Sequence, residues 1–393
     1  MLGRSRRKDL PELIPGYATH EATQAYADRS GLAESHYSDY GEEALKLSSI
    51  GLGTDHGEPT DDVDAGYREA LAHGLQGGLN VIEAGLSYRY GRSARAAGAA
   101  IREAVASGVP REALFVVGKG GFLAFPDGPP DDLAAWFKEE ILKKGMGTPD
   151  ELAQGVHLLT PAYIAWQVEQ TRQTLGVETL DAFLIDQSEV HIPELQTKED
   201  LNGKLQKVYA VLEMMVQAGK LRSYGLATWK SCRVPTNDGL FQSLTSQVGV
   251  AEKAAGDPQG HHLRLVTMPY NVNMLEGFTR FNQATGQGNV ASTVQAAYQL
   301  GLYFIATHAL MGGQLVGEQP PILRQAMGDL RTNAQRALQF ARSTPGVGTA
   351  MVSMARKDHM DEALELGRLP PMSRKAFLKM FEQAEDEAEE AEG

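Results

Sequence analysis

The sequence lacks several features that would define its class at once. It has a single cysteine, Cys232, which excludes an internal disulfide and any metal site built from several cysteines. No apolar run approaches the roughly 20 residues that a membrane-spanning helix needs. The opening residues, MLGRSRRKDLPELIPG, contain no apolar core of a secretory signal. We therefore expect a cytoplasmic protein that has no membrane as a partner.

Positive charge is also scarce. The chain has 37 Lys and Arg against 50 Asp and Glu, a formal net charge of −13. Nucleic acids and anionic membrane surfaces bind basic patches, so we expect neither of them as a partner. The expected partner is a small-molecule substrate. Much of the negative charge lies in the last residues, EQAEDEAEEAEG. We expect an acidic C-terminal helix or tail over residues 372–393.

Eight short apolar runs recur along the chain. They are continuous and do not alternate with polar residues, which is typical of strands buried on both faces of a parallel sheet. The runs cover residues 47–54, 80–85, 114–121, 180–186, 221–228, 264–271, 302–309 and 349–355.

Amphipathic segments with helix end signals separate these runs. DDVDAGYREALAHGLQGG opens with Asp and closes with Gly-Gly, and TPAYIAWQVEQTRQTLG begins with the favoured Thr-Pro pair. The alternation predicts an α/β fold, a (β/α)₈ TIM barrel with N- and C-terminal extensions. We expect one domain over residues 1–393, with core strands between about 46 and 355. A doubly wound open sheet is the alternative, although no run is followed by a G-x-G-x-x-G turn.

Four side chains lie at or just after the ends of predicted strands. Glu83 lies near the end of the second run, Lys119 near the end of the third and Asp186 at the end of the fourth, and Tyr88 lies in the loop after the second. The carboxyl ends of barrel strands meet on one face, so these groups should lie close together. A lysine beside a phenol lowers the pKa of the phenol and suits it for proton transfer. A set of structural salt bridges at the barrel rim is the other interpretation.

The segment NVIEAGLSYRYGRS resembles the aldo-keto reductase superfamily, in which this stretch reads roughly N-V-I-D-T-A-x-N-Y-R-Y-x-R-S. KGGFLAF, TPAYI, SYGLATW, MPYNVNMLEGFT and GGQL extend the resemblance along the chain. It implies that Tyr88 is the proton donor and that Lys119 tunes it. The family aspartate that holds the lysine is Glu83 here, and the family histidine is Asp186. In that family an acid at the histidine position goes with reduction of a C=C bond conjugated to a carbonyl.

The resemblance also implies the cofactor NADP. Residues after the fifth and sixth strands would hold the nicotinamide, and the loop THALMGGQL would hold the pyrophosphate. Two cations after the eighth strand, Arg356 and Lys357, suit a 2′-phosphate. The full set of expected cofactor contacts is Ala227, Thr228, Thr267, His308, Leu310, Gly313, Leu315, Arg356, Lys357 and Glu362.

No metal is expected, because His191, His261 and His262 have no converging ligands at suitable spacing. We interpret all three as loop residues, and His191 is also a weak candidate for the substrate pocket.

Three functions stay open. The first is an NADP-dependent reductase of a carbonyl or of a C=C bond conjugated to one. The second is a non-redox enzyme, such as an isomerase, dehydratase or cyclase, that uses Tyr88 and Lys119 for proton transfer. The third is a catalytically silent relative.

Overall fold

The computed structural model describes residues 12–126, 128–285 and 288–382. Its centre is a closed barrel of eight strands in which every neighbouring pair is parallel. Around the barrel the strands are β3 (Ile50–Gly53), β4 (Val81–Gly85), β5 (Phe115–Gly120), β8 (Leu180–Asp186), β9 (Leu221–Ala227), β10 (Leu263–Pro269), β13 (Tyr303–Thr307) and β14 (Val347–Ser353). The predicted (β/α)₈ barrel is confirmed, and the open sheet is wrong.

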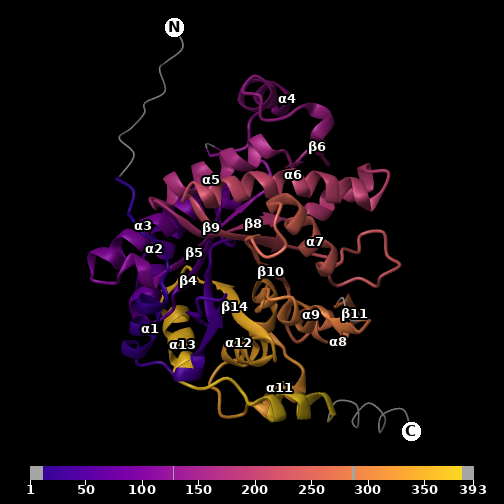
Figure 1. The fold of residues 1–393 in the computed structure, drawn as a ribbon. Helices are drawn as coiled ribbons and strands as arrows, with labels where there is room; N and C mark the ends of the chain where they lie inside the picture. Colours follow the sequence, from indigo (N-terminus) through magenta and orange to yellow (C-terminus); the bar gives the residue numbers. More distant parts are fainter. Residues whose placement is uncertain (1–11, 127, 286–287, 383–393) are drawn as a thin grey trace.

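Helices surround the barrel, as Figure 1 shows. The principal ones are α2 (Asp61–Gly77), α3 (Arg92–Ala106), α5 (Pro161–Leu175), α6 (Lys198–Gln217), α7 (Leu244–Ala255), α9 (Thr293–Gln299), α12 (Asn333–Ser343) and α13 (Lys357–Gly367). The end signals act as the sequence predicts: Thr160 Oγ1 accepts the N–H of Tyr163 at the start of α5, and Gly78 ends α2 at φ 115°.

Two apolar clusters hold the barrel together. One fills the interior with side chains that include Val81, Phe115 and Ile305, and the other packs the outer face of the strands against the helices. The hairpin of β1 (Tyr37–Tyr40) and β2 (Leu45–Ser48) adds Tyr40, Leu45 and Leu47 to the interior cluster. The hairpin therefore covers the N-terminal end of the barrel, where only a smaller cavity of about 240 Å³ lies among the described residues.

Insertions lengthen three of the connections. The one after β5 carries α4 (Leu133–Phe137), β6 (Leu152–Ala153) and β7 (His157–Leu158), and it has its own small core around Phe137 and Leu158. Figure 1 places α4 outside the ring of helices. The connection after β10 holds α8 (Glu276–Thr279), β11 (Phe281–Ala284) and β12 (Val290–Ser292). The one after β13 holds α10 (Gln314–Gly317) and α11 (Pro321–Ala326).

Both ends of the chain extend beyond the barrel. Near the N-terminus, α1 (His20–Arg29) precedes the β1–β2 hairpin. At the other end, residues 374–382 are helical, and the rings of Phe377 and Phe381 pack edge-on or tilted against those of Phe278 and Phe340. The rest of the predicted acidic tail, residues 383–393, lies outside the described residues. None of the described helices is both long enough and apolar enough to cross a membrane.

Candidate active site

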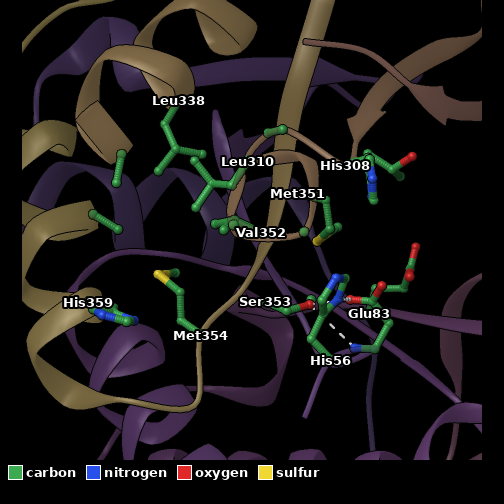
Figure 2. Close-up of a pocket in the computed structure, with 18 of the residues that line it drawn as sticks. His56, Glu83, His308, Leu310, Leu338, Met351, Val352, Ser353, Met354 and His359 are labelled. Atoms are coloured by element: carbon green, nitrogen blue, oxygen red, sulfur yellow. Dashed lines mark hydrogen bonds and ion pairs between the residues drawn. The ribbon is translucent and has the colours of Figure 1, made fainter. Parts of the chain in front are cut away.

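A cavity of about 780 Å³ opens at the C-terminal end of the barrel. Each of the eight strands contributes a lining residue near its C-terminal end: Gly53, Glu83, Lys119, Asp186, Ala227, Thr267, Thr307 and Ser353. Figure 2 shows that the cavity is elongated, with Glu83, His56 and His308 toward one end and His359, Met354 and Leu338 toward the other. The functional ends of barrel strands therefore meet in one elongated site.

Glu83, Tyr88 and Lys119 make direct contact in this cavity. Lys119 Nζ lies 3.0 Å from the hydroxyl oxygen of Tyr88 and 3.2 Å from Oε1 of Glu83. The same Oε1 lies 3.4 Å from the Tyr88 hydroxyl, so the three groups form a closed triangle. Glu83 and Lys119 are 4% and 8% exposed, and Oε2 of Glu83 has no hydrogen-bond partner within the described part of the chain. This oxygen is buried from solvent in the free protein and is an acceptor that no described residue satisfies.

The local fold explains why Tyr88 reaches the lysine. A Cβ on Gly85 would come within 3.2 Å of the Tyr88 ring, so glycine at the end of β4 allows the phenol to pack against the strand. The next residue, Arg89, anchors the loop: its guanidinium donates to the carbonyl of Glu58 at 2.9 Å and to Asp64 at 2.5 Å. Structural ion pairs thus hold the loop, while the phenol points into the cavity.

Burial dominates the protonation of this cluster. It raises the pKa of Tyr88 well above its ordinary value, because burial and the acids Glu83 and Asp186 outweigh the opposing charge of Lys119. Burial alone would lower the pKa of Lys119, but Glu83, Tyr88 and Asp186 hold it well above its ordinary value. Lys119 thus lowers the pKa of the phenol, as predicted, but burial and the neighbouring acids raise it by more. Tyr88 stays protonated, as a proton donor must.

Asp186 lies at the end of β8 and lines the same cavity. Burial raises its pKa, Asp55 adds to the increase, and Lys119 and a hydrogen bond from Gln187 oppose it. An acid with a raised pKa in an apolar site can remain neutral and donate a hydrogen bond. The structure therefore brings together the four predicted catalytic residues, Glu83, Tyr88, Lys119 and Asp186.

Most of the predicted cofactor contacts also line the cavity. These are Ala227, Thr228, Thr267, His308, Leu310, Gly313 and Glu362. Trp229 joins them, with its ring 5.2 Å from that of His308 in an edge-on arrangement. Glu189 holds this loop, because its Oε1 accepts the backbone N–H groups of Trp229 and Lys230 at 2.6 and 3.0 Å.

Three predicted contacts do not reach the cavity. Leu315 is buried beside it without lining it. The exposed guanidinium of Arg356 pairs with Asp358, and Lys357 lies 3.3 Å from Asp361. The basic side chains of Arg331, Arg336 and His359 line the cavity instead.

Asp55 and His56 were missed by the sequence reasoning. They follow β3 directly, so the same inspection of strand ends could have found them. Nδ1 of His56 lies 2.8 Å from Oδ1 of Asp55, which also accepts a hydrogen bond from Ser353. Hydrogen bonding to Asp55 raises the pKa of His56 above its ordinary value. Within the described ranges, no group of three or more His, Cys, Asp or Glu residues is placed to hold a metal ion.

Comparison with known proteins gives a family match over part of the chain. Residues 49–240 match the sequence model of the aldo/keto reductase family. A comparison with curated proteins gives no match.

Solved structures with the same barrel include three reductases of low sequence identity. One is an aldo/keto reductase from Klebsiella pneumoniae in complex with NADP and acetate, with 18% identity over 88% of this chain and 94% of the other, and a TM-score of 0.56. The holo form of an aldo-keto reductase from Bacillus halodurans has 15% identity over 88% and 95%, and a TM-score of 0.57. The thermostable aldo-keto reductase Tm1743 with the inhibitor epalrestat has 17% identity over 88% and 98%, and a TM-score of 0.58. Residues 49–240 therefore match the aldo/keto reductase family model, and the closed parallel barrel is the fold that these solved reductases share.

Proposed function

We propose that this protein is an NADP-dependent reductase of a small molecule, acting on a carbonyl or on a C=C bond conjugated to a carbonyl. The observation that carries the proposal is the buried contact of Lys119 Nζ with the Tyr88 hydroxyl at 3.0 Å and with Glu83 at 3.2 Å, inside the elongated cavity. A charged lysine beside a protonated phenol favours donation of a proton to a reacting oxygen. NADP-bound relatives of the same fold add support.

The residues along the cavity fit a dinucleotide. Gly312 and Gly313 line it at φ 62° and 92°, and a Cβ on Gly313 would meet open space, so the backbone there can approach a pyrophosphate closely. Thr228 Oγ1 is buried without a hydrogen bond to any described residue, and its polar neighbour is the thiol of Cys232, a weak donor. That hydroxyl is buried in the free protein, and we infer that it would turn toward the carboxamide of a bound nicotinamide. When bound, NADPH supplies a hydride to the substrate carbon.

Tyr88 and Lys119 take the other half of the reaction. Negative charge develops on the substrate oxygen as the carbon accepts the hydride, and the phenol donates its hydrogen bond and then its proton to that oxygen. The positive charge of Lys119 stabilises the phenolate that remains. Glu83 keeps Lys119 in place, because a buried cation without a carboxylate would be costly.

Asp186 favours a conjugated C=C substrate over an isolated ketone. Its buried carboxyl has a raised pKa and lies in the same cavity as Tyr88. A neutral carboxylic acid there can donate a second hydrogen bond to the carbonyl oxygen of an enone, whose charge increases when hydride adds at the distant carbon. An imidazole at this position would lack the acidic proton of a carboxylic acid.

NADPH consumption tests the proposal. We expect protein fluorescence to be quenched when NADPH is added, since Trp229 lines the cavity. The oxidation of NADPH should then be followed with aldehydes, ketones and enones of small size. The variant Tyr88→Phe should lose roughly 10²- to 10⁴-fold in turnover while it still binds NADPH.

Tyr90→Phe is the matched control, because Tyr90 is in the same loop but does not line the cavity. Turnover that survives Tyr88→Phe would contradict the assignment of Tyr88. If NADPH does not bind, the non-redox proton-transfer enzyme becomes the better hypothesis, and binding without consumption of any substrate class would favour the catalytically silent relative.

A further inference from the structure

Two buried histidines lie directly behind Asp186. His157 belongs to β7 in the insertion after β5, and His191 belongs to the helical turn Ser188–Glu194. His157 Nε2 lies 2.6 Å from the backbone oxygen of Asp186, and His157 Nδ1 lies 3.0 Å from His191 Nε2. The two side chains are 0% and 3% exposed, and neither lines the cavity. The chemistry proposed above gives them no role.

The partners of these rings determine where their protons are. A backbone oxygen can only accept, so Nε2 of His157 must carry a proton and donate it to Asp186. Burial lowers the pKa of His157 to about 4 and that of His191 to about 3, so both rings are neutral at pH 7. Nδ1 of His157 is then an acceptor, and Nε2 of His191 must donate to it. The hydrogen bonds therefore run in one direction, from His191 through His157 to Asp186.

The His157 ring also joins the ends of two catalytic strands. A Cβ on Gly121 would come within 2.3 Å of His157 Nε2 and 3.1 Å of the Asp186 oxygen, so the imidazole occupies space that a side chain at position 121 would need. The N–H of Leu158, next to His157, donates to the carbonyl of Gly121 at 2.9 Å. Gly121 lies two residues after Lys119. The ring thus fixes the end of β5 against the end of β8.

The turn after β8 needs this support. Gln187 adopts a left-handed conformation, φ 47° and ψ 53°, which is unfavourable for a residue with a side chain. Its N–H donates to the carbonyl of Ala227 at 2.6 Å. The hydrogen bond from His157 to Asp186 holds the other side of the same peptide group. Together the two bonds fix the peptide plane and, with it, the direction in which the Asp186 carboxyl enters the cavity.

We propose that His157 and His191 are positioning residues for Asp186. Through hydrogen bonds to its backbone oxygen, the pair holds the Asp186 carboxyl in the buried place from which it faces a bound molecule. The inference goes beyond the proposed reductase function, because it concerns the conformation of Asp186 whichever molecule is reduced. It predicts properties that can be measured without a substrate.

Nitrogen NMR of histidine gives the first test. In the full-length protein at pH 7, both His157 and His191 should be neutral with the proton on Nε2. In His191→Phe, the donor to His157 Nδ1 is lost, and His157 should begin to populate the Nδ1–H form. His191→Gln retains an N–H at the same distance along the side chain and should restore the Nε2–H form of His157. A proton on Nδ1 of either ring in the wild-type protein would overturn the inference.

The pKa of Asp186, measured by carbon NMR of labelled aspartate carboxyls, gives the second test. His157→Phe removes the donor to Asp186, so water should reach the carboxyl and its pKa should fall toward the ordinary range. His157→Gln keeps both a donor and an acceptor and should preserve the raised value. If NADPH-dependent turnover is found, it should fall roughly 10- to 100-fold in His157→Phe, because misplacing a reacting group by about 1 Å has such an effect.

His36→Phe is the matched control. His36 is also fully buried and pairs with Ser49 and Arg342 away from the cavity. Its loss should lower stability without changing the pKa of Asp186. An unchanged pKa of Asp186 in both His157→Phe and His191→Phe would show that the pair is only structural. If His157→Phe does not fold, His191→Phe and the proton positions in the wild-type protein still test whether the pair positions Asp186.

Discussion

Oδ1 of Asp55 lies 2.8 Å from Nδ1 of His56 and also accepts a hydrogen bond from Ser353, which joins the ends of β3 and β14 at the cavity wall. The carboxylate fixes the His56 proton on Nδ1 and leaves Nε2 on the side of Gly312, where a Cβ would lie 3.6 Å away. Burial alone would raise the pKa of Asp55, but His56 and Ser353 lower it to about 2, so the carboxylate stays charged at neutral pH. Its hydrogen bond in turn raises the pKa of His56.

This pair should make NADPH binding depend on pH. Since the pKa of His56 is raised above 6.5, its imidazolium is present below that pH and is lost as the pH rises through the raised value. We expect NADPH affinity to fall over the same interval, by roughly fivefold, the equivalent of about 1 kcal/mol for a half-exposed charged hydrogen bond. Isothermal titration across pH 5.5–8.5 would measure it.

His56→Gln should remove most of this pH dependence, while His20→Gln, a change at an exposed histidine away from the cavity, should leave it as in the wild type. An affinity that does not change with pH in the wild-type protein would show that His56 does not contact the nucleotide.

The buried pair of Lys119 and Glu83 should dominate the stability of the rim. Lys119→Met leaves the Glu83 carboxylate buried without a cation, which should cost about 3–5 kcal/mol of unfolding free energy at pH 7. Burial already raises the pKa of Glu83. In the variant its folded pKa lies above the unfolded one, so stability is regained as the pH falls and the acid takes up a proton.

Urea unfolding at pH 7 and pH 5 would measure both effects. The double variant Glu83→Gln, Lys119→Met should recover much of the loss, because no unpaired charge is left. A double variant that is as unstable as the sum of the two single variants would show that the pair is not coupled.

The barrel could be predicted because its strands have a recognisable sequence pattern. Both faces of β4 are buried, so neighbouring residues such as Val81 and Ile82 are both apolar and form a continuous run. Thr160 and Pro161 mark the start of α5. In a closed parallel barrel, the C-terminal ends of all strands lie on the same face. This convergence is why Glu83 and Asp186 could be grouped without coordinates.

Other features depend on packing that no sequence pattern shows. His157 and His191 are 34 residues apart and meet only because the insertion after β5 folds back onto the turn after β8. The pKa of Tyr88 depends on how deeply the phenol is buried, and here burial outweighs the nearby lysine. The direction of an exposed side chain such as Arg356 is set by its neighbour Asp358.

The orientation of Arg356 bears on cofactor preference. The resemblance assigns the 2′-phosphate of NADP to Arg356. Arg331 is as exposed and also pairs with an acid, Glu365, but unlike Arg356 it lines the cavity. We expect Arg331→Glu to weaken NADPH about tenfold more than NADH, since it replaces attraction to a phosphate by repulsion. Arg356→Glu should change the two affinities more nearly equally.

Fluorescence titration of both variants with each nucleotide decides between the arginines. A larger change in preference from Arg356→Glu would restore the assignment made from sequence, and equal losses for both nucleotides in both variants would remove the two residues from the phosphate site.

Replacing Asp186 should change which substrates are reduced. Asp186→His introduces the residue expected from the resemblance, and it removes the buried carboxyl that we propose favours a conjugated C=C bond. We expect the rate of ketone or aldehyde reduction to rise relative to that of enone reduction by roughly tenfold or more. Asp186→Asn is the matched comparison: it has the same shape, but its amide is a weaker hydrogen-bond donor than a carboxylic acid, so enone reduction should fall about 10²-fold while NADPH affinity stays within about twofold. Product analysis of ketone and enone mixtures by chromatography gives the ratio directly. A ratio that is the same in the wild type and in Asp186→His would mean that Asp186 does not select the reaction, and that its raised pKa reflects burial alone.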